Sequence, residues 1–141
     1  MVDLIYFIIL ILLGYFIGSY IEKRHYKSID KRETELLYLP VVSGKNFLEE
    51  KDIEKAELVY GSVVVSIDYF KLVLFGLRNF IGGEVLSLET VIDRARREAI
   101  LRLKEKVKDA DMILNLKVET SRISWTASEV LAYGTAIYYK K

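Results

Sequence analysis

The sequence predicts an α+β protein, in which a single N-terminal transmembrane helix precedes a small domain of β-α-β-β order. An apolar run without charge occupies residues 4–21. Three later segments are rich in β-branched or alternating apolar residues, and a long amphipathic segment separates the first of them from the second. We therefore expect an antiparallel three-stranded sheet that is covered on one face by a long helix.

Residues 1–21 are the predicted transmembrane anchor. The run LIYFIILILLGYFIGSYI at 4–21 is just long enough to cross a hydrocarbon core as a helix. The basic residues nearest to it follow the run rather than precede it, and they are Lys23, Arg24, Lys27, Lys31 and Arg32. By the positive-inside rule, this asymmetry predicts single-pass localisation in the cell membrane, with the lipid bilayer as a partner and the soluble domain in the cytoplasm.

Two features join the anchor to the rest of the chain. Gly14 and Gly18 are four residues apart, a spacing that lets two helix backbones approach closely, so they form the predicted site of membrane helix packing. Residues 22–40 form a predicted juxtamembrane stalk. This stalk is expected to end at Pro40, because the residue before a proline is disfavoured in a helix.

Three segments of the soluble domain are predicted strands. Residues 56–67 are apolar on both faces and therefore suit a central strand. Residues 111–121 alternate between apolar and polar side chains, and residues 128–139 follow after a short loop, which predicts a hairpin. The apolar side chains expected to share one face of the second strand are Met112, Leu114, Leu116 and Val118.

Two helical segments lie between the first and second strands. Residues 68–80 are apolar nearly all round, which predicts a helix that is buried in the domain or pressed against a neighbouring subunit or the membrane surface. Residues 88–110 form an amphipathic helix, with an apolar stripe of Leu88, Ile92, Ala95, Ala99, Leu103 and Val107. Its predicted solvated face carries the i,i+4 ion pairs Asp93–Arg97, Arg94–Glu98 and Glu98–Arg102.

Composition excludes several classes of function. The chain has 141 residues with 21 basic and 20 acidic side chains, so no basic surplus indicates a nucleic-acid partner. Cysteine is absent and His25 is the sole histidine, which excludes thiolate chemistry and makes a Ser-His-Asp site implausible. No catalytic motif is found, and we predict a protein that is not an enzyme. The absence of glutamine favours a thermophile.

One helix can cover only one face of the predicted sheet. Alternate residues of VYGSVVV and AYGTAIYY would then expose apolar side chains to water on the other face. Self-association with closed cyclic symmetry is the simplest way to cover them, so the chain itself is a predicted partner. Trp125, in the loop before the last strand, is an exposed aromatic candidate for contact with an unknown protein partner or with the membrane surface.

Four stretches resemble, in order and spacing, the YbjQ-like family of small domains labelled as heavy-metal-binding. They are VYGSVVVS, LRNFIGGE, ARREAILRLKEKVKDADMILNLKVETS and EVLAYGTA, and the resemblance covers residues 41–139. It implies that residues 41–141 form an oligomerisation domain with a dodecin-like fold, assembled as a ring, with a pentamer as the expected form. It implies no established activity.

The stretch FGLRNFIGGEV at 75–85 is the candidate site of the domain. Gly82 and Gly83 are expected to end one helix before the next begins. Charged and polar groups beside such a bend should pair with each other or hold a ligand between subunits, and Arg78, Asn79 and Glu84 are the candidates. The primary hypothesis is an assembly or scaffold protein without a cofactor. The alternative is a metal or small-ligand sensor, with a divalent ion near Glu84.

Overall fold

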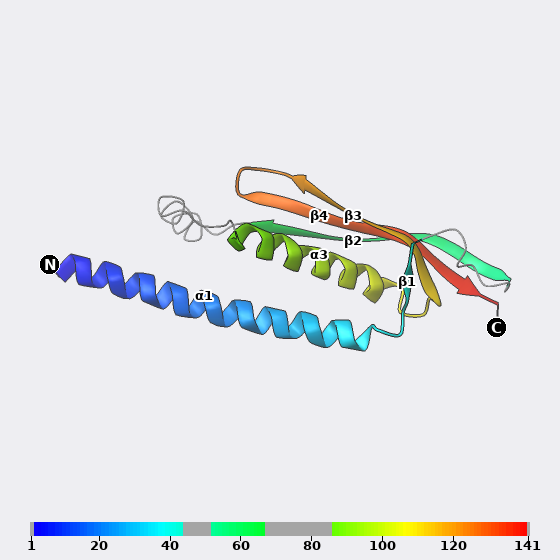
Figure 1. Cartoon of the computed structure of the whole chain (residues 1–141), viewed down its shortest axis with the longest axis horizontal. Coiled ribbons are helices and arrows are strands. Elements are labelled where there is room, and N and C mark those ends of the chain that lie inside the picture. The colour runs from blue at the N-terminus through cyan, green and yellow to red at the C-terminus, as the bar shows by residue number, and fades with distance from the viewer. Residues whose placement is uncertain (1, 44–51, 67–85, 141) are drawn as a thin grey trace. The chain divides into compact units, whose positions relative to one another are not determined.

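The structure is a computed structural model that describes residues 2–43, 52–66 and 86–140. The elements in chain order are α1 (Val2–Glu35), β1 (Val41–Val42), β2 (Ile53–Ser66), α3 (Leu86–Lys106), β3 (Met112–Arg122) and β4 (Ala127–Tyr139) (Figure 1). The chain divides into two compact units, Met1–Thr34 and Glu35–Lys141. The first unit is helical, and the second contains the sheet and α3.

The sheet of the second unit has four strands in the order β1-β3-β4-β2. β3 and β4 are antiparallel, as are β4 and β2, whereas β1 is parallel to β3. The predicted antiparallel three-stranded sheet was therefore wrong. The additional strand forms because Val41 and Val42 pair with Ile113 and Leu114. The pairing begins directly after Pro40, whose carbonyl accepts a hydrogen bond from the Ile113 amide at 3.0 Å. The implied dodecin-like fold is not supported.

Helix α3 packs along one face of the sheet, against β2 and β4 (Figure 1). The sequence predicted this helix, and four residues of its stripe, Ala95, Ala99, Leu103 and Val107, are buried in the main core. Small alanines bring the helix backbone close to the strands, because they separate the two surfaces by no more than a methyl group. The strand residues of the same core are Val59, Val63, Ile113, Val130, Ala132 and Ala136.

A bulge interrupts β3 at Asn115. The pairing of β3 with β4 shifts between Leu114 and Lys117, and Asn115 has a positive φ of 53°. The extra residue reverses which side chains face the helix, because side chains alternate along a strand. Met112 and Leu114 consequently lie in a second cluster, whereas Leu116 packs against the main core, so the prediction that these side chains share one face was wrong.

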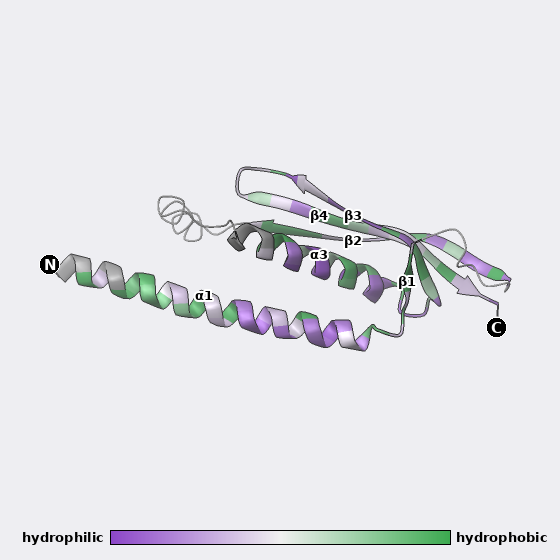
Figure 2. Cartoon of the chain, in the orientation of Figure 1, coloured by the Kyte–Doolittle hydropathy of each residue, from purple (hydrophilic) through white to green (hydrophobic). Residues whose placement is uncertain are grey.

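The first unit is the helix α1. Among the residues whose placement the structure describes, no helix is long and apolar enough to cross a membrane. The apolar part of α1 ends at Ile21, and Glu22, Lys23 and Arg24 follow it in the same helix. Figure 2 shows this change from hydrophobic to hydrophilic along the helix. The predictions of a transmembrane anchor and of single-pass membrane localisation were therefore wrong.

Part of the predicted domain lies outside the described residues. The predicted helix at 68–80 and the stretch 75–85 both fall there. The observed strands otherwise agree closely with the expected ones: β2 begins at Ile53 rather than at 56, and β4 begins at Ala127 rather than at 128. The predicted division of the chain into residues 1–21, 22–40 and 41–141 stays a prediction, except that the first segment is not supported as a membrane span.

Candidate functional site

The candidate site is the surface of the sheet opposite α3, which we call the outer face. Val59, Gly61 and Val63 of β2 are buried towards the helix, so the alternating residues between and beside them point the other way. Leu58, Tyr60 and Val64 on this outer face are 74%, 55% and 60% exposed. Large apolar side chains on a strand are rarely left to water in this number, which marks the outer face as a contact surface.

Strand β4 supplies the middle of the outer face. Leu131 pairs with Ser62 and Tyr133 pairs with Tyr60, so both side chains lie beside the exposed residues of β2 and are themselves half-buried. At one end of the same face a second apolar cluster is buried within the subunit, formed by Met112, Leu114, Ile137 and Tyr139. One end of the outer face is thus covered within the subunit, whereas the part that contains Leu58, Tyr60 and Val64 is exposed.

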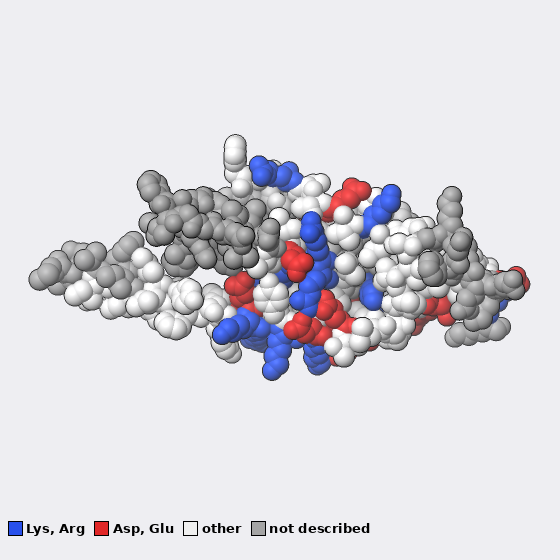
Figure 3. Space-filling model, in the orientation of Figure 1, with Lys and Arg blue, Asp and Glu red and all other residues white. Residues whose placement is uncertain are grey.

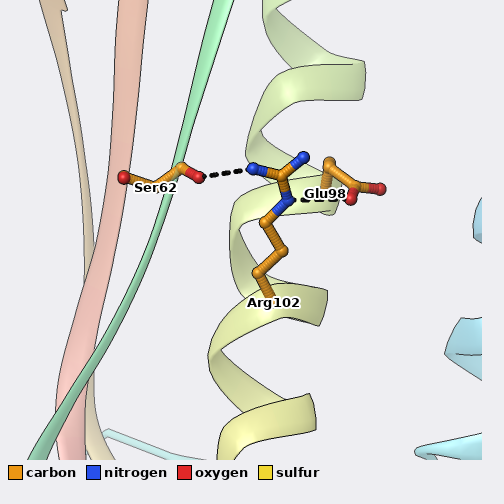
Figure 4. Close-up of polar contacts among 3 residues, drawn as sticks. All are labelled: Ser62, Glu98 and Arg102. Carbon is orange, nitrogen blue, oxygen red and sulfur yellow. Dashed lines mark hydrogen bonds and ion pairs between the residues drawn. The ribbon is translucent and has the colours of Figure 1, made fainter.

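Two basic side chains of α3 reach the edge of β2. Arg102 donates from Nη1 to the Ser62 carbonyl at 3.0 Å, and Lys106 donates from Nζ to the Tyr60 carbonyl at 2.8 Å. Figure 4 shows Arg102 held between this carbonyl and the Glu98 carboxylate, 3.1 Å from its Nε. The predicted ion pair between Glu98 and Arg102 is present, and Arg102 is half exposed, but Glu98 is buried, so this pair does not lie on a fully solvated face as predicted. These contacts occupy edge carbonyls that could otherwise bind another strand.

Two tyrosine hydroxyls of β4 donate to carboxylates of its neighbouring strands. Tyr133 bonds Glu119 of β3 and Tyr138 bonds Glu57 of β2, each at 2.8 Å. The bond to Glu119 raises the pKa of Tyr133. Burial, supported by the bond to Glu57, raises the pKa of Tyr138 to about 12. Lys55, 2.7 Å from the Glu57 carboxylate, lowers the pKa of that carboxyl.

The raised pKa of Tyr138 predicts a loss of stability in strong alkali. An unfolded tyrosine titrates near pH 10, whereas Tyr138 in the folded chain titrates at about 12, so the folded state holds this proton more tightly. Its contribution is complete below about pH 10 and is lost as the pH rises to about 12. We expect Tyr138→Phe to remove this part of the decline, measured as unfolding free energy across that range. An equally steep decline in the variant would contradict the assignment.

The structure places some predicted site residues and not others. Arg78, Asn79, Gly82, Gly83 and Glu84 lie outside the described residues, so their proposed convergence stays a prediction. Gly14 and Gly18 lie in α1, where an added Cβ at either position would meet nothing within 4 Å, and their role in helix packing is likewise untested. Trp125 is 92% exposed at the tip of the β3–β4 hairpin.

Neither a cluster of metal ligands among the described residues nor a patch of one charge on the face drawn in Figure 3 marks a binding site. It contains no group of three or more histidine, cysteine, aspartate or glutamate side chains that could hold a metal. On the face drawn in Figure 3, basic and acidic side chains are interspersed rather than gathered into a patch of one sign. The sequence did not predict the contacts of Arg102 and Lys106 with the edge of β2, because their spacing alone equally suits a solvated helix.

Comparison with known proteins identifies the family of the second unit. The YbjQ family model, described as "Putative heavy-metal-binding", matches residues 40–140. The chain belongs to this family. A YbjQ-family relative, a UPF0145 protein from Clostridium novyi, is 35% identical over 99 residues, which cover 69% of this chain and 96% of the relative. The resemblance noted in the sequence is thereby confirmed at the level of the family.

Two further comparisons extend this result. A UPF0145 protein from Psychrobacter arcticus is 38% identical over 86 residues, covering 60% of this chain and 54% of that protein. Among solved structures, a protein of unknown function of the DUF74 family from Pediococcus pentosaceus matches with a TM-score of 0.43 and 17% identity, covering 72% of this chain and 97% of the other. The match to the family model at residues 40–140 covers the strands of the sheet and α3, and α1 lies outside it.

Proposed function

We propose that this protein is a homo-oligomeric assembly or scaffold protein whose subunits associate through the outer face of the sheet. The observation that supports this most directly is the exposure of Leu58, Tyr60 and Val64, at 74%, 55% and 60%. They project from one edge-lying strand, next to half-buried Leu131 and Tyr133 of β4. Further copies of the chain, arranged around a cyclic axis, can cover this face without any other partner.

Burial of this face would stabilise an assembly substantially. Each large apolar side chain contributes about 1.5–3 kcal/mol when it is fully removed from water, and in proportion to its exposed fraction when it is already partly covered. The three exposed residues of β2 therefore offer each subunit on the order of 4 kcal/mol. Closed cyclic symmetry lets every subunit bury this surface, and the family resemblance favours a ring of five subunits.

A ring of this kind would present repeated copies of its remaining surfaces to a protein partner. Hairpin tips are suited to that role, because Trp125 and Ile123 at the tip are 92% and 58% exposed. The hairpin is held by hydrogen bonds from the Ile123 and Ser124 amides to the Ala127 carbonyl, at 3.0 and 3.1 Å. A firmly held tip can present an aromatic side chain at little cost in conformational entropy.

Replacement of Leu58 with glutamate tests this assembly. We expect Leu58→Glu to reduce the mass of the full-length chain towards that of a single subunit or a pair, because a carboxylate cannot be buried in an apolar interface without a partner. The measurement is light scattering in a mild detergent, which keeps the exposed apolar side chains of α1 in solution. Circular dichroism should be unchanged, since Leu58 is already exposed within the subunit.

Lys108→Glu is the matched control, because it also adds a carboxylate at an exposed position but lies in the turn after α3. It should leave the mass of the assembly unchanged. A wild-type chain that is monomeric at micromolar concentration, or a Leu58→Glu chain that retains the wild-type mass, would overturn the proposed assembly.

The description of the family favours metal or small-ligand binding as a second candidate function. In this chain the sequence assigns such a site to Arg78, Asn79 and Glu84, contributed by several subunits. Metal analysis of the protein purified without chelator tests it, with Glu84→Ala as the comparison. Stoichiometric metal in the wild-type chain that is lost in the variant would favour this candidate, whereas equal and negligible metal in both would eliminate it.

A further inference from the structure

The outer edge of β3 is a second surface that the proposed ring does not use. Of the strands that the structure describes, β1 alone pairs with this edge, and its pairing extends only to Ile113 and Leu114. β3 continues for several residues beyond that pairing, and every residue from 117 to 122 is exposed. The edge therefore offers backbone hydrogen-bonding groups along a straight, accessible segment.

The opposite edge of the same sheet is protected. There, Arg102 and Lys106 of α3 donate to the carbonyls of Ser62 and Tyr60 on β2, at 3.0 and 2.8 Å. Basic side chains laid over an edge prevent another strand from pairing with it. The two edges of the sheet thus differ, and this difference directs strand addition to β3.

The hairpin determines which backbone groups of β3 point outwards. The Ile123 amide donates to the Ala127 carbonyl of β4 at 3.0 Å, so the backbone of Ile123 faces β4. In an antiparallel pair, successive residues face alternately towards and away from the neighbouring strand. The amides and carbonyls of Val118 and Thr120 consequently point outwards, and those of Lys117 and Glu119 point towards β4.

We infer that the β3 edge binds the β3 edge of a second copy of this chain, as an antiparallel pair about a two-fold axis at Val118. In this register the outward groups of Val118 exchange hydrogen bonds with those of the partner's Val118. Lys117 then lies directly opposite the partner's Glu119, and Glu119 opposite the partner's Lys117. These flanking positions are non-hydrogen-bonded pairs, in which side chains approach each other most closely.

Charge complementarity selects this register over its neighbours. A shift that places Glu119 opposite the partner's Glu119 brings two carboxylates together, which is destabilising. A further shift, which centres the pair on Thr120, opposes Glu119 with Ser121 and forms no ion pair. The Glu119 carboxylate is also oriented in advance, because it accepts a hydrogen bond from Tyr133 at 2.8 Å. Orientation before binding lowers the entropy lost on association.

The two-fold pairing is independent of the outer face, since it uses an edge rather than a surface of the sheet. Together the two interfaces produce assemblies with an even number of subunits, such as two rings joined through their β3 edges. If only the edge pairs, the full-length chain is a dimer. If only the outer face associates, the ring retains its own subunit number and is not doubled.

Charge exchange across the two-fold axis tests the pairing. Lys117→Glu and Glu119→Lys each convert two attractive pairs per interface into two repulsive ones. On dilution, the assembly should dissociate into halves at a characteristic concentration. We expect either substitution to raise this concentration by about ten- to a hundred-fold relative to the wild-type chain. The combined Lys117→Glu and Glu119→Lys chain restores opposite charges and should recover the wild-type mass, as should an equimolar mixture of the two single variants.

Arg122→Glu is the matched control, because it reverses an exposed charge on the same strand outside the paired segment. It should leave the mass unchanged, and the Leu58→Glu chain should remain a dimer through β3. Halving in both single variants with recovery in the combined chain supports the pairing. A wild-type assembly with an odd number of subunits, unchanged mass in the single variants, or a folded combined variant without recovery would each overturn it.

Discussion

Gly61→Ala is expected to reduce the free energy of unfolding by about 3 kcal/mol, the upper end of the cost of overpacking a core. A methyl group at this position of β2 would lie 2.6 Å from the Leu103 amide nitrogen and closer still to the Ala99 carbonyl oxygen. Both are backbone atoms of α3, which cannot turn aside as a side chain can. The helix would therefore have to move away from the sheet as a whole.

Such a movement would also break the contacts on either side of Gly61. Arg102 and Lys106 hold the helix to the carbonyls of Ser62 and Tyr60, at 3.0 and 2.8 Å, and these carbonyls belong to the residues that flank the glycine. A displaced helix would separate Ala95 and Ala99 from the strands they pack against. Unfolding in denaturant, followed by circular dichroism on the full-length chain, measures the loss.

Two other glycines provide graded controls. An added Cβ at Gly134 would lie 3.0 Å from a methyl group of Ile113 and 3.1 Å from the Leu114 carbonyl, so Gly134→Ala should cost about 1 kcal/mol. At Gly14 the same atom meets nothing within 4 Å, and alanine is the better helix former. Gly14→Ala should therefore cause no loss. A Gly61→Ala chain within about 0.5 kcal/mol of wild type would show that α3 does not rest on β2 as described.

The elements with strong periodicity were the ones that could be predicted. The stripe through Ala95, Ala99, Leu103 and Val107 identified α3 and its buried face, because a helical period of 3.6 residues is visible in the sequence. β2 and β4 were located through their β-branched residues. The exposed apolar face also followed, since a single helix covers only one side of a sheet.

Features that depend on distant partners could not be predicted. β1 has only two residues, and it becomes a strand because Ile113 and Leu114 lie beside it. The bulge at Asn115 leaves the alternating pattern of β3 unchanged in the sequence while it reverses the directions of the side chains. The part of the β3 edge that no described strand covers likewise depends on strand order, which no local pattern of residues reveals.

Lys104→Met is expected to cost about 2–3 kcal/mol, because the Lys104 ammonium holds the segment between α1 and β1 to the end of α3. Its Nζ donates to the carbonyls of Leu36 and Leu39, at 3.2 and 2.9 Å. Methionine keeps the length and the apolar part of the side chain but cannot donate. The carbonyls of Leu36 and Leu39, two buried residues, would then lose a charged donor.

The loss should appear in hydrogen exchange at β1 as well as in global stability. The Ile113 amide donates to the Pro40 carbonyl at 3.0 Å, immediately after the segment that Lys104 holds, so this amide should exchange faster in Lys104→Met. Lys108→Met makes the same chemical change at an exposed position of the following turn, and it should alter the unfolding free energy by less than about 0.5 kcal/mol. Equal effects at the two positions would mean that loss of a positive charge, rather than loss of the bonds to Leu36 and Leu39, destabilises the chain.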